Sequence, residues 1–330
     1  MNLPLAIRRL LWALSVLYAG AMSLRASFYA RGWIKQKRLQ GSVISIGNLT
    51  VGGTGKTPMV IWLAERFLSE GKRVAVLSRG YRGQGNTSDE IELMKSRLQG
   101  RVVFGVGKDR YAEGKRLESG VDVFIMDDGF QHLALGRDLD IVLVDATRPL
   151  VREWVLPAGR LRESCSAINR ADVVIFTRTE ESVKALPVIP KVPRMTIYPA
   201  KMSLIGFREH RPEARVQGSC VEPVFAFAGI GNPDAFFANL KRWNVRVVGR
   251  RTFRDHHCYT NREIEGLSAA ARRAGARALM TTEKDAQNIG SVVVPDLPLQ
   301  IAVISMEIPD EERLMRDIRE RLKMGSGVAA

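Results

Sequence analysis

Short runs of apolar, often β-branched residues recur along the chain, separated by stretches in which apolar positions have helical spacing. Runs of this kind, bounded by glycine and polar residues, are typical of strands buried on both faces. Strands that alternate with helices predict a mostly parallel sheet that is covered on both faces by helices. The expected strands are 42–46, 72–77, 101–104, 121–126, 140–145, 172–176, 224–228, 245–248, 278–281 and 299–304, and the expected helices are 108–118, 233–242, 261–274 and one that starts at 89.

The pattern changes over residues 187–223, which contain several prolines and two alternating runs, 194–199 and 202–207. These runs predict a connecting hairpin. We therefore expect a core over 35–186, a linker over 187–223 and a second, smaller α/β lobe over 224–330. A separate helix is expected within residues 1–34.

The N-terminal segment is basic and apolar. Residues 1–40 contain no acidic residue, and the uncharged stretch 10–24 lies between Arg9 and Arg25. Fifteen such residues are fewer than the roughly 18–20 that span a bilayer comfortably. A signal peptide is one interpretation, and a helix packed on the protein's own core is another. We favour a helix that lies in or dips into an anionic inner leaflet with its arginines facing lipid.

The composition adds a strong charge. The 330 residues carry a net charge of +15, which favours a polyanionic partner such as nucleic acid, an anionic membrane or a phosphorylated substrate. A solvated basic surface is the alternative. Three scattered cysteines without a C-x-x-C pair favour a reduced, cytosolic setting and indicate neither a disulfide framework nor a zinc site.

The most informative stretch follows the first expected strand. Its sequence, NLTVGGTGKTP over 48–58, places glycines around Thr54 and a Lys-Thr pair at the start of a helix. Glycines let backbone N–H groups surround an anion, and the helix N-terminus favours negative charge. Lys56 is expected to reach the β- and γ-phosphates of a nucleotide and Thr57 to hold Mg²⁺. The general pattern G-x-x-x-x-G-K-[ST] has glycine where this chain has Thr50, and an ordinary strand–helix turn is the competing interpretation.

Two adjacent aspartates support the nucleotide interpretation. Asp127 and Asp128 end the apolar run 121–126, and a strand that ends in a carboxylate supplies the metal side of many NTPase sites. Which of the two holds Mg²⁺ stays open. Because ligands bind beyond the carboxyl ends of parallel strands, we expect the glycine turn, Arg79, this pair and Asp145 at one sheet edge.

The second lobe has one polar stretch of interest, FRDHHCYT over 253–260. Adjacent histidines point apart, so His256 and His257 are poor joint ligands for one metal. TTEKD over 281–285 is expected to be a polar strand end, which we place near the same cleft.

Together these motifs resemble the tetraacyldisaccharide 4′-kinases, the lipid A 4′-kinases of Gram-negative bacteria. The segments that carry the resemblance are SIGNLTVGGTGKTP (45–58), SRGY (78–81), GKDR (107–110), DDGFQH (127–132), DLDIVLVDA (138–146), LPAGRLRE (156–163), FRDHHCYT (253–260) and TTEKDA (281–286). The resemblance implies a P-loop NTPase core that transfers the γ-phosphoryl group of ATP, with Mg²⁺, to the 4′-hydroxyl of a tetraacyldisaccharide 1-phosphate, giving lipid IVA. It also implies a location at the cytoplasmic face of the inner membrane through the N-terminal helix.

The resemblance further implies roles for single residues. Asp89 corresponds to the family's acidic base, with His256 as its partner, and the neighbouring Glu90 competes for that assignment because the segment before it is shorter than in the family. Lys56 and Asp128 complete the catalytic set. The implied phosphate cradle is Thr50, Val51, Gly52, Gly53, Thr54, Gly55, Lys56 and Thr57; the implied metal ligands are Thr57, Asp127, Gln131 and Glu163; and the implied lipid contacts are Arg79, Tyr81 and His132.

Two other classes of protein compete with a lipid kinase. One is a membrane- or DNA-associated ATPase of the partitioning type, but those proteins carry a lysine before the paired glycines, where this chain has Val51. The other is a basic structural protein with a decayed site, which the intact Lys56-Thr57 and Asp127-Asp128 pairs disfavour. We therefore expect a lipid substrate and an anionic membrane as partners, and no nucleic acid.

Overall fold

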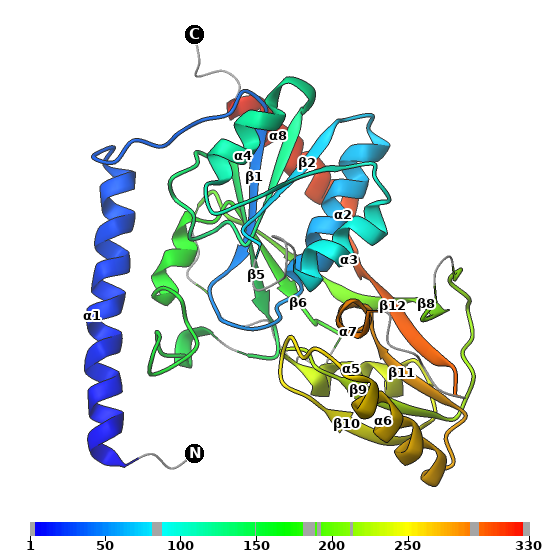
Figure 1. Cartoon of the computed structure of the whole chain (residues 1–330). Helices are drawn as coiled ribbons and strands as arrows, with labels where there is room; N and C mark the ends of the chain where they lie inside the picture. The colour runs from blue at the N-terminus through cyan, green and yellow to red at the C-terminus, as the bar shows by residue number, and fades with distance from the viewer. Residues whose placement is uncertain are drawn as a thin grey trace. The chain divides into compact units, whose positions relative to one another are not determined.

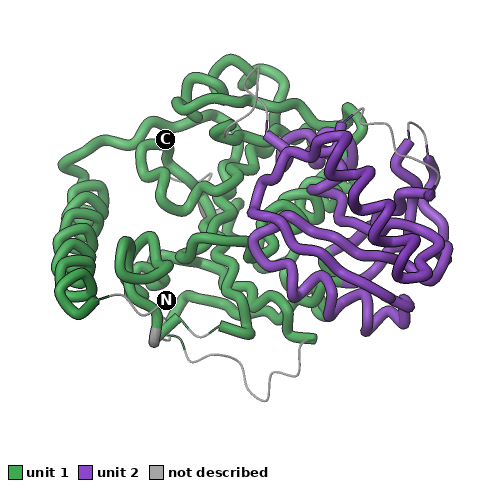
Figure 2. Tube along the Cα trace, turned by 60° about the horizontal axis from the view of Figure 1, so that its bottom comes forward, with its two compact units in different colours: residues 1–81, 98–202, 306–330 green, residues 82–97, 203–305 purple. Residues whose placement is uncertain are grey.

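The computed structural model describes residues 4–80, 88–148, 150–180, 189, 193–211, 214–290 and 297–325. The chain forms two compact units (Figure 2). Unit 1 contains residues 1–81, 98–202 and 306–330, and unit 2 contains residues 82–97 and 203–305. The chain passes between them within β8 (Lys201–Glu209) and β12 (Leu299–Glu307), among other places.

Unit 1 is built on a seven-stranded sheet of order β3-β2-β4-β1-β5-β6-β7, and its strand pairs are parallel. Its strands are β1 (Ser42–Asn48), β2 (Val74–Ser78), β3 (Val103–Val106), β4 (Val123–Asp127), β5 (Leu139–Asp145), β6 (Val173–Thr177) and β7 (Thr196–Pro199). The central strands are buried along their whole length, as expected for a parallel sheet covered on both faces (Figure 1). The strand order places the ends of β1 and β4 side by side.

Helices flank this sheet along the chain. They are α2 (Lys56–Ser69), α4 (Arg110–Leu117) and α8 (Glu311–Gly325). The long N-terminal α1 (Leu5–Ala30), drawn in blue in Figure 1, stands apart from the sheet. Met59, Val60 and Leu63 of α2 are fully buried, which anchors the helix that follows the glycine turn. The start of this helix is therefore held rigidly beyond the end of β1.

Unit 2 is built on a second sheet, of order β10-β9-β11-β12-β8, in which β9, β10, β11 and β12 pair in parallel. The elements not yet given are β9 (Val224–Ala228), β10 (Val247–Thr252), β11 (Ala278–Thr282), α3 (Asp89–Leu98), α5 (Pro233–Arg242), α6 (Asn261–Arg273) and α7 (Glu283–Ile289). A capping box at Thr260 and Glu263 starts α6, so the preceding loop, 253–260, ends at a fixed point. The fold class agrees with the expectation from the sequence: an α/β core with a parallel sheet, a second α/β unit and an apolar N-terminal helix.

The predicted hairpin over 194–199 and 202–207 is wrong. Both runs are strands, but β7 pairs with β6 of the first sheet, while β8 joins the second sheet beside β12. The buried Ala200 separates them, and its N–H donates to the carbonyl of Phe176. Alternation of apolar and polar residues predicts a strand but not its partner, which packing decides.

Two further differences concern boundaries. The compact units do not follow the expected linear division, because residues 82–97 belong to unit 2 and residues 306–330 belong to unit 1. The stretch 281–285 is not only a strand end: Thr282 caps α7, and its hydroxyl accepts a hydrogen bond from the backbone N–H of Asp285. This cap places Lys284 in the first turn of a helix.

Candidate active site

The glycine turn between β1 and α2 has a backbone conformation that a side chain at two positions would disrupt. Gly52 and Gly55 have φ angles of +112° and +89°. A Cβ atom on Gly52 would lie 2.8 Å from Arg160, and one on Gly55 would lie 2.7 Å from Met202. Only glycine adopts these conformations without strain, so the loop can keep its backbone open to a ligand.

The carbonyl groups of this loop are held by side chains from other elements. Arg160 donates to the carbonyl of Val51 at 2.8 Å and Arg178 to that of Gly53 at 2.7 Å. The Thr177 hydroxyl donates to the carbonyl of Thr54 at 3.0 Å. In a trans peptide the N–H points opposite to the carbonyl, so the N–H groups of residues 52, 54 and 55 face away from these donors. Such an arrangement of N–H groups is suited to phosphate oxygens.

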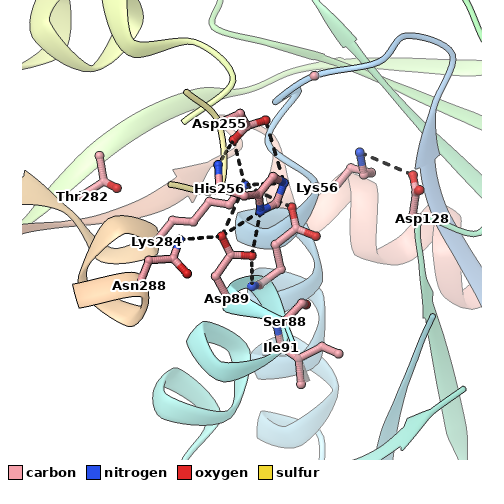
Figure 3. Close-up of polar contacts among 12 residues, drawn as sticks. Lys56, Ser88, Asp89, Ile91, Asp128, Asp255, His256, Thr282, Lys284 and Asn288 are labelled. Carbon is pink, nitrogen blue, oxygen red and sulfur yellow. Dashed lines mark hydrogen bonds and ion pairs between the residues drawn. The ribbon is translucent and has the colours of Figure 1, made fainter. Parts of the chain in front are cut away.

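Asn48 at the end of β1 organises the side chains of the loop. It is fully buried, and its amide donates to the Thr54 hydroxyl at 2.9 Å. Its carbonyl oxygen accepts from Lys56 Nζ at 3.4 Å. The same lysine nitrogen lies 3.4 Å from Oδ1 of Asp128 (Figure 3). The structure thus brings the lysine of the loop and the aspartate beyond β4 together, as the sequence predicts.

Asp128 carries a concentrated set of positive partners. Nη1 of Arg162 lies 2.7 Å from each of its carboxylate oxygens. Burial alone would raise the pKa of Asp128, but the charges of Lys56 and Arg162 outweigh it, so the pKa is lowered. Asp128 also has a φ of +50°, the left-handed region, which costs a non-glycine residue free energy and is common at functional sites.

The remaining predicted metal ligands have different surroundings. Asp127 is buried, and its Oδ2 accepts from the Ser78 hydroxyl at 3.2 Å. Gln131 donates to the carbonyl of Asn48, whereas both oxygens of Glu163 accept from Arg170 at 2.9 and 3.0 Å. Among the residues that the structure describes, no group of three or more His, Cys, Asp or Glu side chains is arranged to hold a metal.

The glycine loop nevertheless has oxygen ligands of the kind that Mg²⁺ prefers. Mg²⁺ usually keeps several waters and needs only one or two carboxylates besides the phosphates of a nucleotide. The Thr57 hydroxyl in the first turn of α2, together with one carboxylate of the Asp127-Asp128 pair, fits that requirement.

The predicted lipid contacts fall partly within the described residues. Arg79 follows β2 and is exposed, Tyr81 lies outside the described residues, and His132 is partly buried. Burial, followed by the charges of Arg110, Arg137 and Arg25, lowers the pKa of His132 to about 4. His132 is therefore neutral at pH 7 and presents an uncharged imidazole.

Unit 2 contains an aspartate–histidine pair. Nδ1 of His256 lies 2.9 Å from Oδ2 and 3.1 Å from Oδ1 of Asp89 (Figure 3). Asn288 of α7 donates to the same Oδ2 at 3.0 Å. The Asp89 side chain is 3% exposed and that of His256 is 50% exposed, so the histidine is the solvent-facing member of the pair.

The two pKa values of this pair move apart. Burial would raise the pKa of Asp89, but the hydrogen bond from His256 and the charge of Lys284 lower it overall. The hydrogen bond to Asp89 raises the pKa of His256 despite burial and the charge of Lys284. The result is a carboxylate that favours its ionised form beside an imidazole that binds its proton more tightly than a free histidine, a combination typical of acid–base catalysis.

The position of Asp89 at the start of α3 explains why Asp89, and not Glu90, is hydrogen-bonded to His256. Ser88 caps α3 by accepting from the N–H of Ile91, and Asp89 Oδ1 accepts from the N–H of Glu90. These contacts direct the Asp89 side chain toward His256. Glu90 instead faces Lys284, with Oε1 3.6 Å from Nζ.

Several residues that the sequence did not single out are part of these sites. Arg110 is buried, its Nε has no hydrogen-bond partner among the described residues, and the charges of Asp127 and Asp128 act on it. Arg178 holds the loop carbonyl of Gly53 and also pairs with Asp145. The GKDR motif gave a signal for Arg110, whereas Arg178 is in no recognised motif.

Comparison with known proteins shows the family of this chain. The family model described as tetraacyldisaccharide-1-P 4′-kinase matches residues 7–323. The chain belongs to this family. A relative from Geobacter metallireducens, named tetraacyldisaccharide 4′-kinase, is 42% identical over 92% of this chain and 95% of its own length. A relative of the same name from Desulfotalea psychrophila is 37% identical over 88% of this chain and 90% of its own length.

A solved structure of the same family has the same fold. The crystal structure of the Aquifex aeolicus family member in complex with ATP aligns over 96% of this chain and 99% of its own, with a TM-score of 0.76 and 30% identity. The family membership expected from the motifs is confirmed. The individual residue roles stay predictions.

Proposed function

We propose that the protein transfers the γ-phosphoryl group of ATP to the 4′-hydroxyl of a tetraacyldisaccharide 1-phosphate. The product of that reaction is the bisphosphorylated lipid IVA. The observation that supports this proposal most directly is the Lys56 ammonium group 3.4 Å from Asp128, at a glycine loop whose carbonyls are held by other elements. A family member's crystal structure in complex with ATP supports the choice of donor.

Unit 1 supplies the phosphoryl-donor site. The N–H groups of the glycine loop bind phosphate oxygens, and Lys56 neutralises charge on the β- and γ-phosphates as it develops in transfer. Thr57 with Asp127 or Asp128 would hold Mg²⁺, which screens the phosphate charges when bound. In this structure the Arg162 guanidinium is hydrogen-bonded to both carboxylate oxygens of Asp128. If Asp128 is the metal ligand, we infer that at least one of these hydrogen bonds breaks when Mg²⁺ binds. Glu163 and Gln131 are the further candidates for metal or phosphate contact.

Unit 2 supplies the acid–base pair. The acceptor hydroxyl must lose its proton to a positioned base, which typically contributes roughly 10²- to 10⁴-fold to rate. Asp89 and His256 share a hydrogen bond, so the two side chains titrate as one unit. When the pair takes up a proton, the neutral imidazole becomes a charged imidazolium beside the carboxylate. Arg79, Tyr81 and His132 are proposed to contact the lipid substrate.

The N-terminal helix is proposed to bind the cytoplasmic face of the inner membrane. Its 26 residues are long and apolar enough to cross a bilayer, but contacts along its length argue for a helix that lies on the surface. The Ser15 hydroxyl, at mid-helix, donates to the carbonyl of Val155 and accepts from the N–H of Ala158. Arg25 donates to the carbonyl of Gln131. One stripe of α1 therefore packs on unit 1, and its remaining apolar side chains face outward.

The exposed apolar residues near this helix support a lipid surface as its partner. Leu10, Leu17 and Leu24 of α1 are exposed, as are Trp33 after the helix and Trp154 in the segment next to the Ser15 contact. Apolar surface of this extent on a soluble face would be costly, whereas a bilayer interface accommodates leucine and tryptophan. The net charge of +15 favours anionic lipid over a neutral surface.

The deciding experiment is a transfer assay. The purified full chain in detergent is incubated with Mg²⁺, γ-labelled ATP and the tetraacyldisaccharide 1-phosphate, and the lipid fraction is tested for a bisphosphorylated product. Transfer of label to lipid supports the proposal. Release of label as inorganic phosphate only, with no labelled lipid, would contradict it and favour an ATPase. We expect no binding to duplex DNA at physiological salt, in contrast to vesicles that contain anionic lipid.

A further inference from the structure

Lys284 lies among acidic residues beside the aspartate–histidine pair of unit 2. Its Nζ is 3.3 Å from Oδ1 of Asp255, 3.6 Å from Oε1 of Glu90 and 3.9 Å from Oδ2 of Asp89. The same nitrogen is 3.4 Å from Nε2 of His256 (Figure 3). The Lys284 side chain is 19% exposed, whereas the side chains of Asp255 and His256 are 38% and 50% exposed, so the lysine is the more buried member of these contacts.

The contact with Nε2 restricts the proton on the imidazole ring. A lysine ammonium group has three donors and no acceptor, so a ring nitrogen that bonds to it must offer its lone pair. In the neutral ring the proton then sits on Nδ1, where it donates to Asp89 at 2.9 Å. The ionised Asp89 favours the same tautomer by accepting at Nδ1, and Lys284 adds a second restraint by keeping the proton off Nε2.

We propose that Lys284 is a positioning residue for the aspartate–histidine pair, because it fixes the neutral His256 ring as the Nδ1–H tautomer that bonds to Asp89. This inference rests on the proposed kinase function. The TTEKDA segment then has two roles: Thr282 caps α7, and Lys284 orients the proposed base.

The charge of Lys284 acts on both members of the pair in the same direction. It lowers the pKa of Asp89 and the pKa of His256. The charged groups around the two side chains are Asp89 and Glu90 from α3, Asp255 from the 253–260 loop and Lys284 itself, with the neutral Asn288 at Asp89. Lys284 is the cation among these groups, so its loss leaves the carboxylates of Asp89 and Asp255 at the imidazole without an opposing charge and raises both pKa values.

The pair must be free of its extra proton to accept one from the substrate. By opposing the carboxylates, Lys284 keeps His256 neutral down to a lower pH than the pair alone would allow. A residue that only neutralised acidic side chains to stabilise the fold would instead affect unfolding and leave the pH dependence of turnover unchanged. The two roles therefore differ in a measurable quantity.

The variants Lys284→Met and Lys284→Arg test the proposal, with Lys95→Met as the matched control. Lys95 lies in α3 and pairs with Glu92, away from the pair. For Lys284→Met we expect kcat at pH 7 to fall about tenfold or more, with the KM for ATP little changed. The midpoint of the acidic limb of kcat/KM should move upward, by about one pH unit. Lys284→Arg should restore most of the activity and the midpoint, and Lys95→Met should resemble the unaltered protein.

A folded Lys284→Met protein whose midpoint stays in place would overturn the proposal. If this variant fails to fold, the unaltered protein still decides the matter through the nitrogen-15 shifts of its histidine rings, assigned with His256→Asn. A proton on Nδ1 of neutral His256 supports the proposal, and a proton on Nε2 overturns it. This measurement needs no lipid, so it is independent of the transfer assay: absence of lipid phosphorylation would remove the kinase function without changing the tautomer.

Discussion

Nδ1 of His256 lies 2.9 Å from Oδ2 of Asp89, although the two residues are 167 positions apart in the chain. The aspartate is almost completely buried and the histidine is half exposed. The histidine is therefore the member of the pair that solvent reaches, and we expect the ionisation of the pair to affect both activity and local stability.

The pH dependence of turnover follows from this pair. Its hydrogen bond to Asp89 raises the pKa of His256 above the ordinary value of 6.5. As the pH falls through that raised pKa, the pair binds its proton and can no longer accept one from the substrate. We expect the acidic limb of kcat/KM to have its midpoint above pH 6.5, and His256→Asn to lose this limb together with most of the activity.

The stabilising effect of the same pair has the opposite pH dependence. A histidine whose pKa is higher in the folded state contributes stability that is fully present below its unfolded pKa and is lost as pH rises through the folded value. The melting temperature of the unaltered protein, compared with that of His256→Asn, should therefore show its largest difference at the acidic end of the range 6 to 8. An equal difference throughout this range would contradict the pairing.

Lys56 is the second target. Its ammonium group lies between Asn48 and Asp128, where it would meet the phosphates of ATP. Lys56→Ala should reduce lipid phosphorylation to near background, because an unneutralised phosphate charge in transfer costs several orders of magnitude in rate. The control is Lys115→Met, since Lys115 lies in α4 and forms an ion pair with Glu118. A Lys56→Ala protein with more than about a tenth of the normal kcat would argue against this loop as the donor site.

Arg178 tests the role of the loop carbonyls. It holds the carbonyl of Gly53 at 2.7 Å and pairs with Asp145. Hydrogen bonds to charged groups contribute about 1.5–3 kcal/mol, so Arg178→Met should weaken ATP binding roughly tenfold to hundredfold. Arg178→Lys should recover part of this loss, since lysine cannot make both contacts with the geometry of a guanidinium.

Titration of ATP binding by calorimetry measures this effect. Arg116→Met is the control, because Arg116 forms an exposed ion pair with Glu113 within α4. If Arg178→Met binds ATP as tightly as the control does, the loop keeps its shape without the guanidinium.

Leu17 tests the membrane surface. It is 70% exposed on α1, so a charge there should leave the melting temperature nearly unchanged. Leu17→Glu should bind vesicles of anionic phospholipid more weakly than the unaltered protein, because it removes apolar contact and adds repulsion. Co-sedimentation with vesicles measures this, and equal binding by the two proteins would contradict a lipid-facing side of α1.

The phosphate-binding loop was predictable because its parts are contiguous. A strand, a glycine turn and a helix start over 42–57 depend on local backbone preferences, and the structure has them as β1, the loop and α2. Helix α5 likewise has the expected bounds, since Asn232 caps it and Pro233 begins it. Family motifs also indicated Asp89 and His256 as partners, but not through any local pattern.

The tertiary structure alone decided how distant segments combine. The alternation of apolar and polar residues predicted the strands β7 and β8 but not their partners. Each strand joins a different sheet, β7 beside β6 and β8 beside β12, so they do not form a hairpin. The left-handed backbone of Asp128 and His256, with φ of +50° and +58°, is one that Asp and His tolerate better than most residues, but no local pattern predicted it. In the same way Lys284 lies 3.4 Å from Nε2 of His256 because the 253–260 loop packs against α7, where the Tyr259 hydroxyl donates to Asp285. Local sequence sets which backbone shapes are favourable, whereas the positions of charged side chains around one proton depend on packing between segments far apart in the chain.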